Sequence, residues 1–142
     1  MAAIVQGAPL PRTLDLDVTP SPNPENKRRL AEALAYLDAR LRAPGLDEPI
    51  DIPLDERTFT GMTTMTFMTR LGPFDVCFVP DGTNGYDDLV RDARTVEFNG
   101  VSTPVASLDD IVRSKMAARR EKDAAHLVIL AEEIGRRRGK KP

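Results

Sequence analysis

Three aspartates on two predicted strands are the side chains of this chain best suited to chemistry. Residues 12–18 read R-T-L-D-L-D-V, and the alternation of apolar and polar side chains predicts a β-strand over 13–18. Asp15 and Asp17 then share one face, roughly 6.6 Å apart along the strand. Both carboxylates can reach one divalent cation, or share a pair of them. Taken alone, the motif is better explained as the solvated face of an edge strand, where charges discourage pairing with another chain.

Asp75 favours the metal hypothesis over the edge-strand one. It lies in F-D-V-C-F-V, residues 74–79, a predicted strand that is apolar on both faces and therefore central in a sheet. A central aspartate is costly unless it is paired or bound to a cation. If this strand neighbours the strand 13–18, Asp15, Asp17 and Asp75 converge. Such a trio is suited to hold Mg²⁺ or Mn²⁺ against the phosphates of a nucleotide.

Local signals predict the elements that position these aspartates. Asn23, Pro24 and Glu25 are typical of a helix start, and apolar residues at helical spacing extend as far as Leu41, so the helix should end before Pro44. Further strands are expected at 63–70 and, around Asn99-Gly100, in a hairpin of 95–98 and 101–105. Helices should follow at 86–93, from Ser107, and at 121–134. The expected fold class is α/β (α+β), a small mixed β-sheet with the three aspartates on one face and helices packed on the other.

Composition narrows the function classes. The chain has 142 residues and a net charge of −2, which argues against broad, non-specific binding to nucleic acid or membrane. Cys77 is the only cysteine and His126 the only histidine, so an internal disulfide and a zinc site of several Cys or His ligands are excluded. Neither a membrane-length apolar run nor a signal peptide is visible, so a cytoplasmic protein is expected. We expect one domain over 1–135 and a basic, solvated C-terminal tail over 136–142.

An ordered set of motifs resembles the nucleotidyltransferase superfamily, which has a polymerase-beta-like fold, and in particular its small bacterial toxin–antitoxin branch. The resemblance covers about residues 7–130. The motifs are, in order, D-L-D, P-N-P-E-N-K-R-R-L-A-E-A-L, L-G-P-F-D-V-C-F, G-Y-D-D-L and V-A-S-L-D-D-I-V-R-S-K-M-A-A-R-R-E-K-D. By resemblance, the protein transfers a nucleotidyl group from a nucleoside triphosphate to a hydroxyl of an RNA, a protein or a small molecule.

The resemblance also implies roles for single residues. Asp15 and Asp17 match the metal-binding pair and Asp75 the third carboxylate. Lys115, Arg120 and Lys122 match a C-terminal motif and are expected to contact nucleotide phosphates or to anchor the catalytic aspartates; Asp123, in the same motif, is expected to position a neighbouring basic side chain. The last two predicted helices are expected to bring Lys115 to the rim of the cleft that holds the aspartates.

One family feature differs in this sequence and keeps a second interpretation open. The family has a Gly-Gly or Gly-Ser turn ahead of D-x-D, which lets phosphate approach backbone N–H groups, whereas residues 1–12 contain only Gly7. The alternative is therefore a non-catalytic interaction protein on the same scaffold, such as a toxin–antitoxin component. Its sheet edge would pair with a partner or with a second copy in a homodimer.

Overall fold

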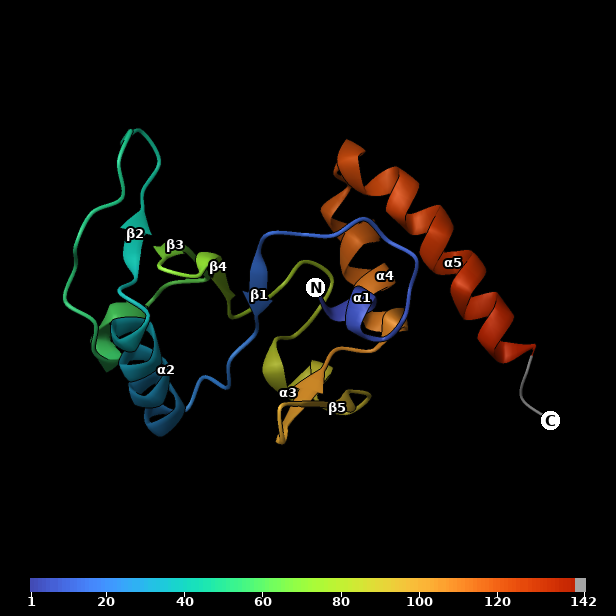
Figure 1. Cartoon of the computed structure of the whole chain (residues 1–142), viewed down its shortest axis with the longest axis horizontal. Helices are drawn as coiled ribbons and strands as arrows, with labels where there is room; N and C mark the ends of the chain where they lie inside the picture. Colours follow the sequence, from blue (N-terminus) through green and yellow to red (C-terminus); the bar gives the residue numbers. More distant parts are fainter. Residues whose placement is uncertain (140–142) are drawn as a thin grey trace. The chain divides into compact units, whose positions relative to one another are not determined.

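The structure, a computed structural model, describes residues 1–139 and consists of two compact units (Figure 1). One unit is formed by residues 13–79. The other is formed by residues 1–12 together with the chain from residue 80 onward. The structure contains helices and both parallel and antiparallel strand pairs, so the predicted α+β class is confirmed.

A mixed four-stranded sheet forms the centre of the unit of residues 13–79. Its strands are β1 (Leu16–Val18), β2 (Arg40–Arg42), β3 (Thr64–Thr69) and β4 (Gly72–Cys77), in the order β1-β4-β3-β2. β1 runs parallel to β4, whereas β3 is antiparallel to both β4 and β2. The strand that carries Asp75 is thus central, as predicted. β1 is shorter than the predicted strand 13–18.

Helix α2 (Pro24–Tyr36) begins where the sequence predicts. The Asn23 side chain accepts a hydrogen bond of 2.8 Å from the backbone N–H of Asn26, and Pro24 occupies the first turn. The predicted continuation to Leu41 is wrong. Asp38 adopts a positive φ of 53°, which ends the helix and turns the chain, and Leu41 lies in β2. The apolar spacing that suggested one long helix arises because Leu41 contributes to the same core from the edge of the sheet.

That core lies on one face of the sheet. Leu34 of α2 and Phe67 of β3 are fully buried, Val76 of β4 is equally inaccessible, and Phe59 closes the cluster from the 3-10 helix η1 (Glu56–Phe59). At about 25 cal/mol per Å² of apolar surface, such side chains stabilise the sheet against the helix by roughly 2 kcal/mol each. They also decide which face of β1 and β4 is left for polar side chains.

The second unit is mainly helical, apart from one hairpin. It contains α1 (Ala2–Val5), α3 (Tyr86–Leu89), β5 (Arg94–Phe98), β6 (Val101–Val105), α4 (Leu108–Ala118), η2 (Glu121–Asp123) and α5 (Ala124–Arg138). The hairpin turn at Asn99-Gly100 is confirmed, with positive φ at both residues. Ser107 caps α4, as its position predicts, by accepting a hydrogen bond from the N–H of Asp110. Leu108 and Leu130 form the centre of this unit's core.

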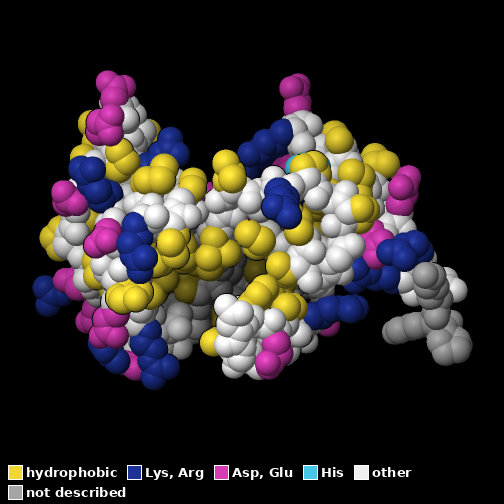
Figure 2. Space-filling view, viewed as in Figure 1, with side chains coloured by type: hydrophobic (Ala, Val, Ile, Leu, Met, Phe, Trp, Pro, Cys, Tyr) yellow, Lys and Arg dark blue, Asp and Glu magenta, His cyan; other side chains and the backbone are white. Residues whose placement is uncertain are grey.

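The predicted basic tail falls partly within α5. Arg136 and Arg137 belong to its last turn, and both donate hydrogen bonds to the buried Glu133 carboxylate. Residues 140–142 of the predicted tail lie outside the described residues. In the described part of the chain, the helices are all too short or too polar to cross a bilayer. On the face shown in Figure 2, acidic and basic side chains are interspersed, in line with the small net charge.

Candidate functional site

Asp17 and Asp75 lie directly opposite each other on adjacent parallel strands. The register pairs Leu16 with Phe74, Asp17 with Asp75 and Val18 with Val76. Residues paired in this way point to the same face of the sheet, with their backbones about 4.8 Å apart. The condition on which the convergence of the aspartates depended, that their two strands are neighbours, is therefore met for Asp17 and Asp75. Like charges in directly opposed positions destabilise a sheet, and a cation bound by both carboxylates would offset that repulsion.

Asp15 stands just outside β1. It is exposed, and its backbone N–H donates a hydrogen bond of 3.2 Å to the hydroxyl of Thr13. The strict strand geometry predicted for Asp15 does not hold, because regular pairing with β4 begins only at Leu16. Asp15 is thus close in sequence to the Asp17–Asp75 pair and has a more adaptable backbone than either member.

Polar side chains continue from this pair across the whole sheet. Asp75 is paired on its other side with Thr66 of β3, and Thr66 in turn with Arg42 of β2. Asp17, Asp75, Thr66 and Arg42 therefore form one cross-strand row on one face; we call it the polar row. The neighbouring row, on the opposite face, is entirely apolar: Leu16, Phe74, Phe67 and Leu41. This alternation is the period-two pattern of a sheet with one face on its core.

One oxygen of Asp75 is buried without a partner. Its Oδ1 atom has almost no accessible surface and no hydrogen bond within the described chain, although the residue as a whole is only half-buried. Buried carboxylate oxygens are normally satisfied by a donor or a cation, because leaving one unsatisfied costs on the order of 1–3 kcal/mol. The Asp75 carboxylate would therefore gain free energy by turning Oδ1 toward a donor or a cation.

The donor set agrees with one type of metal and not with others. Within residues 1–139, no three side chains of His, Cys, Asp or Glu are gathered closely enough to enclose a metal ion. Zinc and calcium sites depend on such enclosing sets. Mg²⁺ is instead commonly bound by one or two carboxylates, with waters and substrate phosphates completing the octahedron. Asp17 and Asp75 fit that second pattern.

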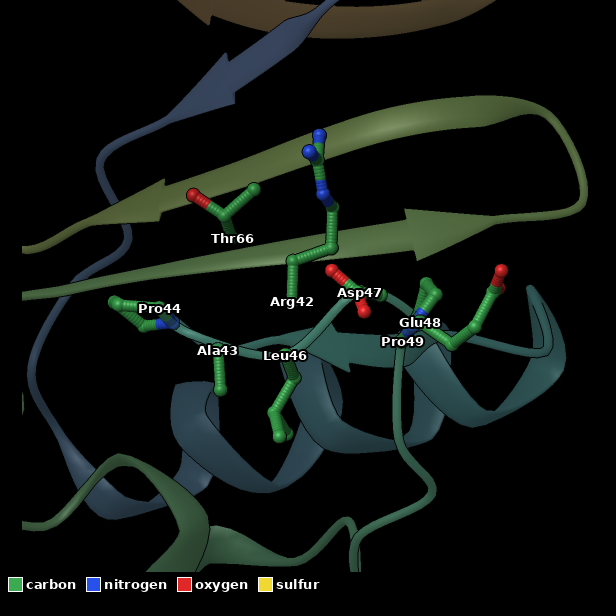
Figure 3. Close-up of a pocket in the computed structure, with 8 residues that line it drawn as sticks. All are labelled: Arg42, Ala43, Pro44, Leu46, Asp47, Glu48, Pro49 and Thr66. Atoms are coloured by element: carbon green, nitrogen blue, oxygen red, sulfur yellow. The ribbon is translucent and has the colours of Figure 1, made fainter.

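A pocket of about 370 Å³ adjoins the far end of the polar row (Figure 3). It is lined by Thr66 of β3, by Arg42 at the end of β2 and, in the segment that follows β2, by Ala43, Pro44, Leu46, Asp47, Glu48 and Pro49. Arg42 and Thr66 extend to the same side of the sheet, as their paired register requires. Sequence analysis missed Arg42 and Thr66, because only the strand register places them in line with Asp75.

The predicted basic residues belong to the unit that continues from residue 80. Lys115 of α4 donates a hydrogen bond to Oδ1 of Asp123, whose side chain is only 6% exposed. Burial raises the pKa of Asp123, but the hydrogen bond and charge of Lys115, aided by Arg120 and Lys122, outweigh it and leave that pKa below its usual range. The prediction that Asp123 positions a basic side chain agrees with this pair. A phosphate contact by Lys115 stays a prediction.

The other two basic residues of the motif are more accessible. Arg120 lies 4.0 Å from the carboxylate of Asp81, with both side chains more than half exposed, and Lys122 is exposed. Nearby, His126 is half-buried, with Nδ1 3.9 Å from Oδ1 of Asp123. Exposed cations such as Arg120 and Lys122 contribute little to folding and are accessible to ligands.

The motif G-Y-D-D-L has a structural role in the same unit. Asp88 accepts hydrogen bonds from the backbone N–H of Asn84, at 3.0 Å, and from Arg113, at 2.9 Å. The pKa of Asp88 is lowered, first by the Asn84 hydrogen bond and, against a smaller effect of burial, by the charge of Arg113. Arg113 therefore joins α4 to α3 through Asp88, and it also donates a hydrogen bond of 2.8 Å to the buried Asp110 within α4.

Comparison of the chain with protein-family models and with curated proteins finds no match. The nucleotidyltransferase resemblance therefore stays a prediction that rests on the sequence motifs.

Proposed function

We propose that the protein is a Mg²⁺- or Mn²⁺-dependent nucleotidyltransferase that uses Asp17 and Asp75, with Asp15 beside them, to hold the cation and the nucleoside triphosphate. The observation that carries the proposal is the opposed Asp17–Asp75 pair, in which Oδ1 of Asp75 is buried and lacks a hydrogen bond within the described chain. When bound there, the cation would polarise the phosphates and lower the pKa of an acceptor hydroxyl.

The chain's own residues have three tasks in this scheme. Asp75 sits in a central strand, so its backbone is fixed by neighbours on both sides and only its carboxylate would have to turn when a cation binds. Asp17, in the edge strand, supplies the second carboxylate. Asp15, outside the regular ladder, can adjust to the substrate that arrives. Oxygens of the triphosphate would complete the coordination that two or three carboxylates leave open.

The acceptor and the partners are also proposals. An acceptor hydroxyl of an RNA, a protein or a small molecule satisfies the same chemistry. Lys115, Arg120 and Lys122 are proposed to bind nucleotide phosphates on the resemblance alone. A cytoplasmic location and a toxin–antitoxin partner rest on the same resemblance.

A second candidate function is supported by the edge of the sheet. β1 pairs only with β4 within the described chain, and Leu14, two residues before the strand begins, is 86% exposed. An open strand edge beside an exposed apolar side chain is suited to pairing with another strand. A non-catalytic protein that binds a partner, or a second copy of itself, through β1 would have this feature.

Calorimetric titration separates the two candidates. Mg²⁺ or Mn²⁺ is titrated with and without a mixture of the four nucleoside triphosphates, into the wild type, Asp17→Asn and Asp75→Asn. The nucleotidyltransferase proposal expects metal-dependent nucleotide binding that each substitution weakens at least about tenfold, since each removes a direct ligand. Glu56→Gln, which removes the same charge at an exposed residue of η1, is the matched control and should bind like the wild type. Equal binding by all four proteins, or none, contradicts the proposal.

A further inference from the structure

Arg42 is a cationic residue at the end of the polar row, and its side chain is accessible to a ligand. Within the described chain it makes no ion pair, whereas Arg40 on the same strand pairs with Asp51 at 3.2 Å. Both side chains point to the polar face, since they are two residues apart in a strand. The guanidinium of Arg42 is therefore available to a ligand, and its planar fork matches a phosphate or a carboxylate through two parallel hydrogen bonds.

The place of Arg42 suits a ligand that also reaches the aspartates. One strand, β3, separates β2 from β4, so Arg42 and Asp75 start two strand spacings apart, about 10 Å. Thr66 stands between them in the row, and its hydroxyl is a further donor to a phosphate oxygen. A nucleotide whose phosphates meet the cation at Asp17 and Asp75 would then extend past Thr66 toward Arg42 and the pocket.

The pocket differs in chemistry from the row that leads to it. Beyond Arg42 its lining includes two carboxylates, Asp47 and Glu48, and apolar surface from Pro44 and Pro49. The carboxylates would repel phosphate, but they can accept hydrogen bonds from the hydroxyls of a ribose. The volume of about 370 Å³ lies in the range of small-ligand sites. This arrangement of charges would orient a bound ligand. Its anionic end would lie toward the cation at Asp75, and its uncharged end would lie in the pocket.

We propose that the pocket beside β2 binds the nucleoside end of the nucleoside triphosphate, with Arg42 on a phosphate oxygen and Asp47 on the ribose. This inference rests on the proposed nucleotidyltransferase function and adds to it the residues that select the substrate. Arg42 and Asp47 are binding residues here, and neither takes part in the transfer step.

Calorimetry with two kinds of ligand, nucleoside triphosphates and inorganic tripolyphosphate, tests the inference. In Mg²⁺, the dissociation constants of ATP, GTP, CTP and UTP and of inorganic tripolyphosphate, which lacks a nucleoside, are measured for the wild type, Arg42→Gln and Asp47→Asn. Arg42→Gln should weaken both kinds of ligand about tenfold, because it removes a phosphate contact. Asp47→Asn should weaken the best-bound nucleotide about fivefold and leave tripolyphosphate unchanged. Arg57→Gln removes another exposed arginine of the same unit, one that forms no ion pair within residues 1–139, and should change neither.

The outcomes distinguish failure of this inference from failure of the proposed nucleotidyltransferase function. If Arg42→Gln and Asp47→Asn bind nucleotides like the wild type while Asp17→Asn does not, the pocket inference is overturned and the metal site stands. If Asp47→Asn weakens tripolyphosphate as much as the nucleotides, the nucleoside does not occupy the pocket. If the wild type binds no nucleotide in Mg²⁺, both proposals are overturned together.

Discussion

Removing the charge of Asp75 should stabilise the protein in the absence of metal. The Asp17 and Asp75 carboxylates stand on paired positions, about 5 Å apart. Their repulsion is then about 0.8 kcal/mol in water and about 3 kcal/mol at an effective dielectric constant of about 20. Asp17 is exposed and Asp75 half-buried, so the lower part of this range applies. Asp75→Asn keeps the shape of the side chain, and its neutral amide costs less to bury than a carboxylate.

We therefore expect Asp75→Asn to raise the free energy of unfolding by about 1 kcal/mol in buffer with chelator, which corresponds to a melting temperature roughly 3–4 °C higher. Differential scanning calorimetry measures both quantities. Mg²⁺ at ten times its dissociation constant should stabilise the wild type by about 1.4 kcal/mol and the variant hardly at all, so the difference between them closes.

Two results would refute this reasoning. The first is a loss of stability in Asp75→Asn without metal, because it would mean that the carboxylate makes a favourable contact. The second is an equal shift of both proteins by Mg²⁺, because the cation would then bind elsewhere. Glu56→Gln serves again as the matched control and should follow the wild type at every metal concentration.

Two further predictions concern the unit that continues from residue 80. Asp123→Ala should cost about 2 kcal/mol, because it leaves the Lys115 ammonium without its buried partner, and Lys115→Met/Asp123→Leu should recover most of that loss. Since folding lowers the pKa of Asp123, the Lys115–Asp123 pair stabilises the protein above about pH 4 and loses its effect as the pH falls through the folded pKa. Urea unfolding of the wild type and of Asp123→Ala from pH 7 to pH 3 should therefore show the difference in their free energies of unfolding shrinking. Gly82→Ala should cost about 2–3 kcal/mol, since φ is +69° and the new Cβ would lie 2.7 Å from the Cβ of Ala117. Gly100→Ala, with φ +81° but open space around it, should cost only about 1 kcal/mol in the same melts; equal losses at the two glycines would count against the steric argument.

Local structure could be predicted from the sequence wherever residues that are close along the chain decide it. The start of α2 at Asn23 and Pro24, the cap of α4 at Ser107 and the hairpin at Asn99-Gly100 all depend on side chains within a few residues. The central place of the strand with Asp75 was also predictable, because both of its faces are apolar. These features follow from residue types and spacing alone.

Longer-range features were misread for a physical reason. Leu41 has helical spacing from the leucines of α2, yet it lies in β2, because the positive φ at Asp38 reverses the chain and pairing with Phe67 stabilises Leu41 in a strand. Strand pairing also decided the extent of β1, which is regular only where β4 lies beside it. Neither effect leaves a signal in the local sequence.

The sequence by itself determined which carboxylates are candidates: Asp15 and Asp17 by their alternation, and Asp75 by its apolar surroundings. Tertiary structure alone decided that Asp17 faces Asp75, that Oδ1 of Asp75 is buried without a hydrogen bond in the described chain, and that Arg42 continues the same row. The reason is that strand register depends on hydrogen bonds between segments up to some sixty residues apart in this chain, and a shift of one residue would turn every side chain of a strand to the other face.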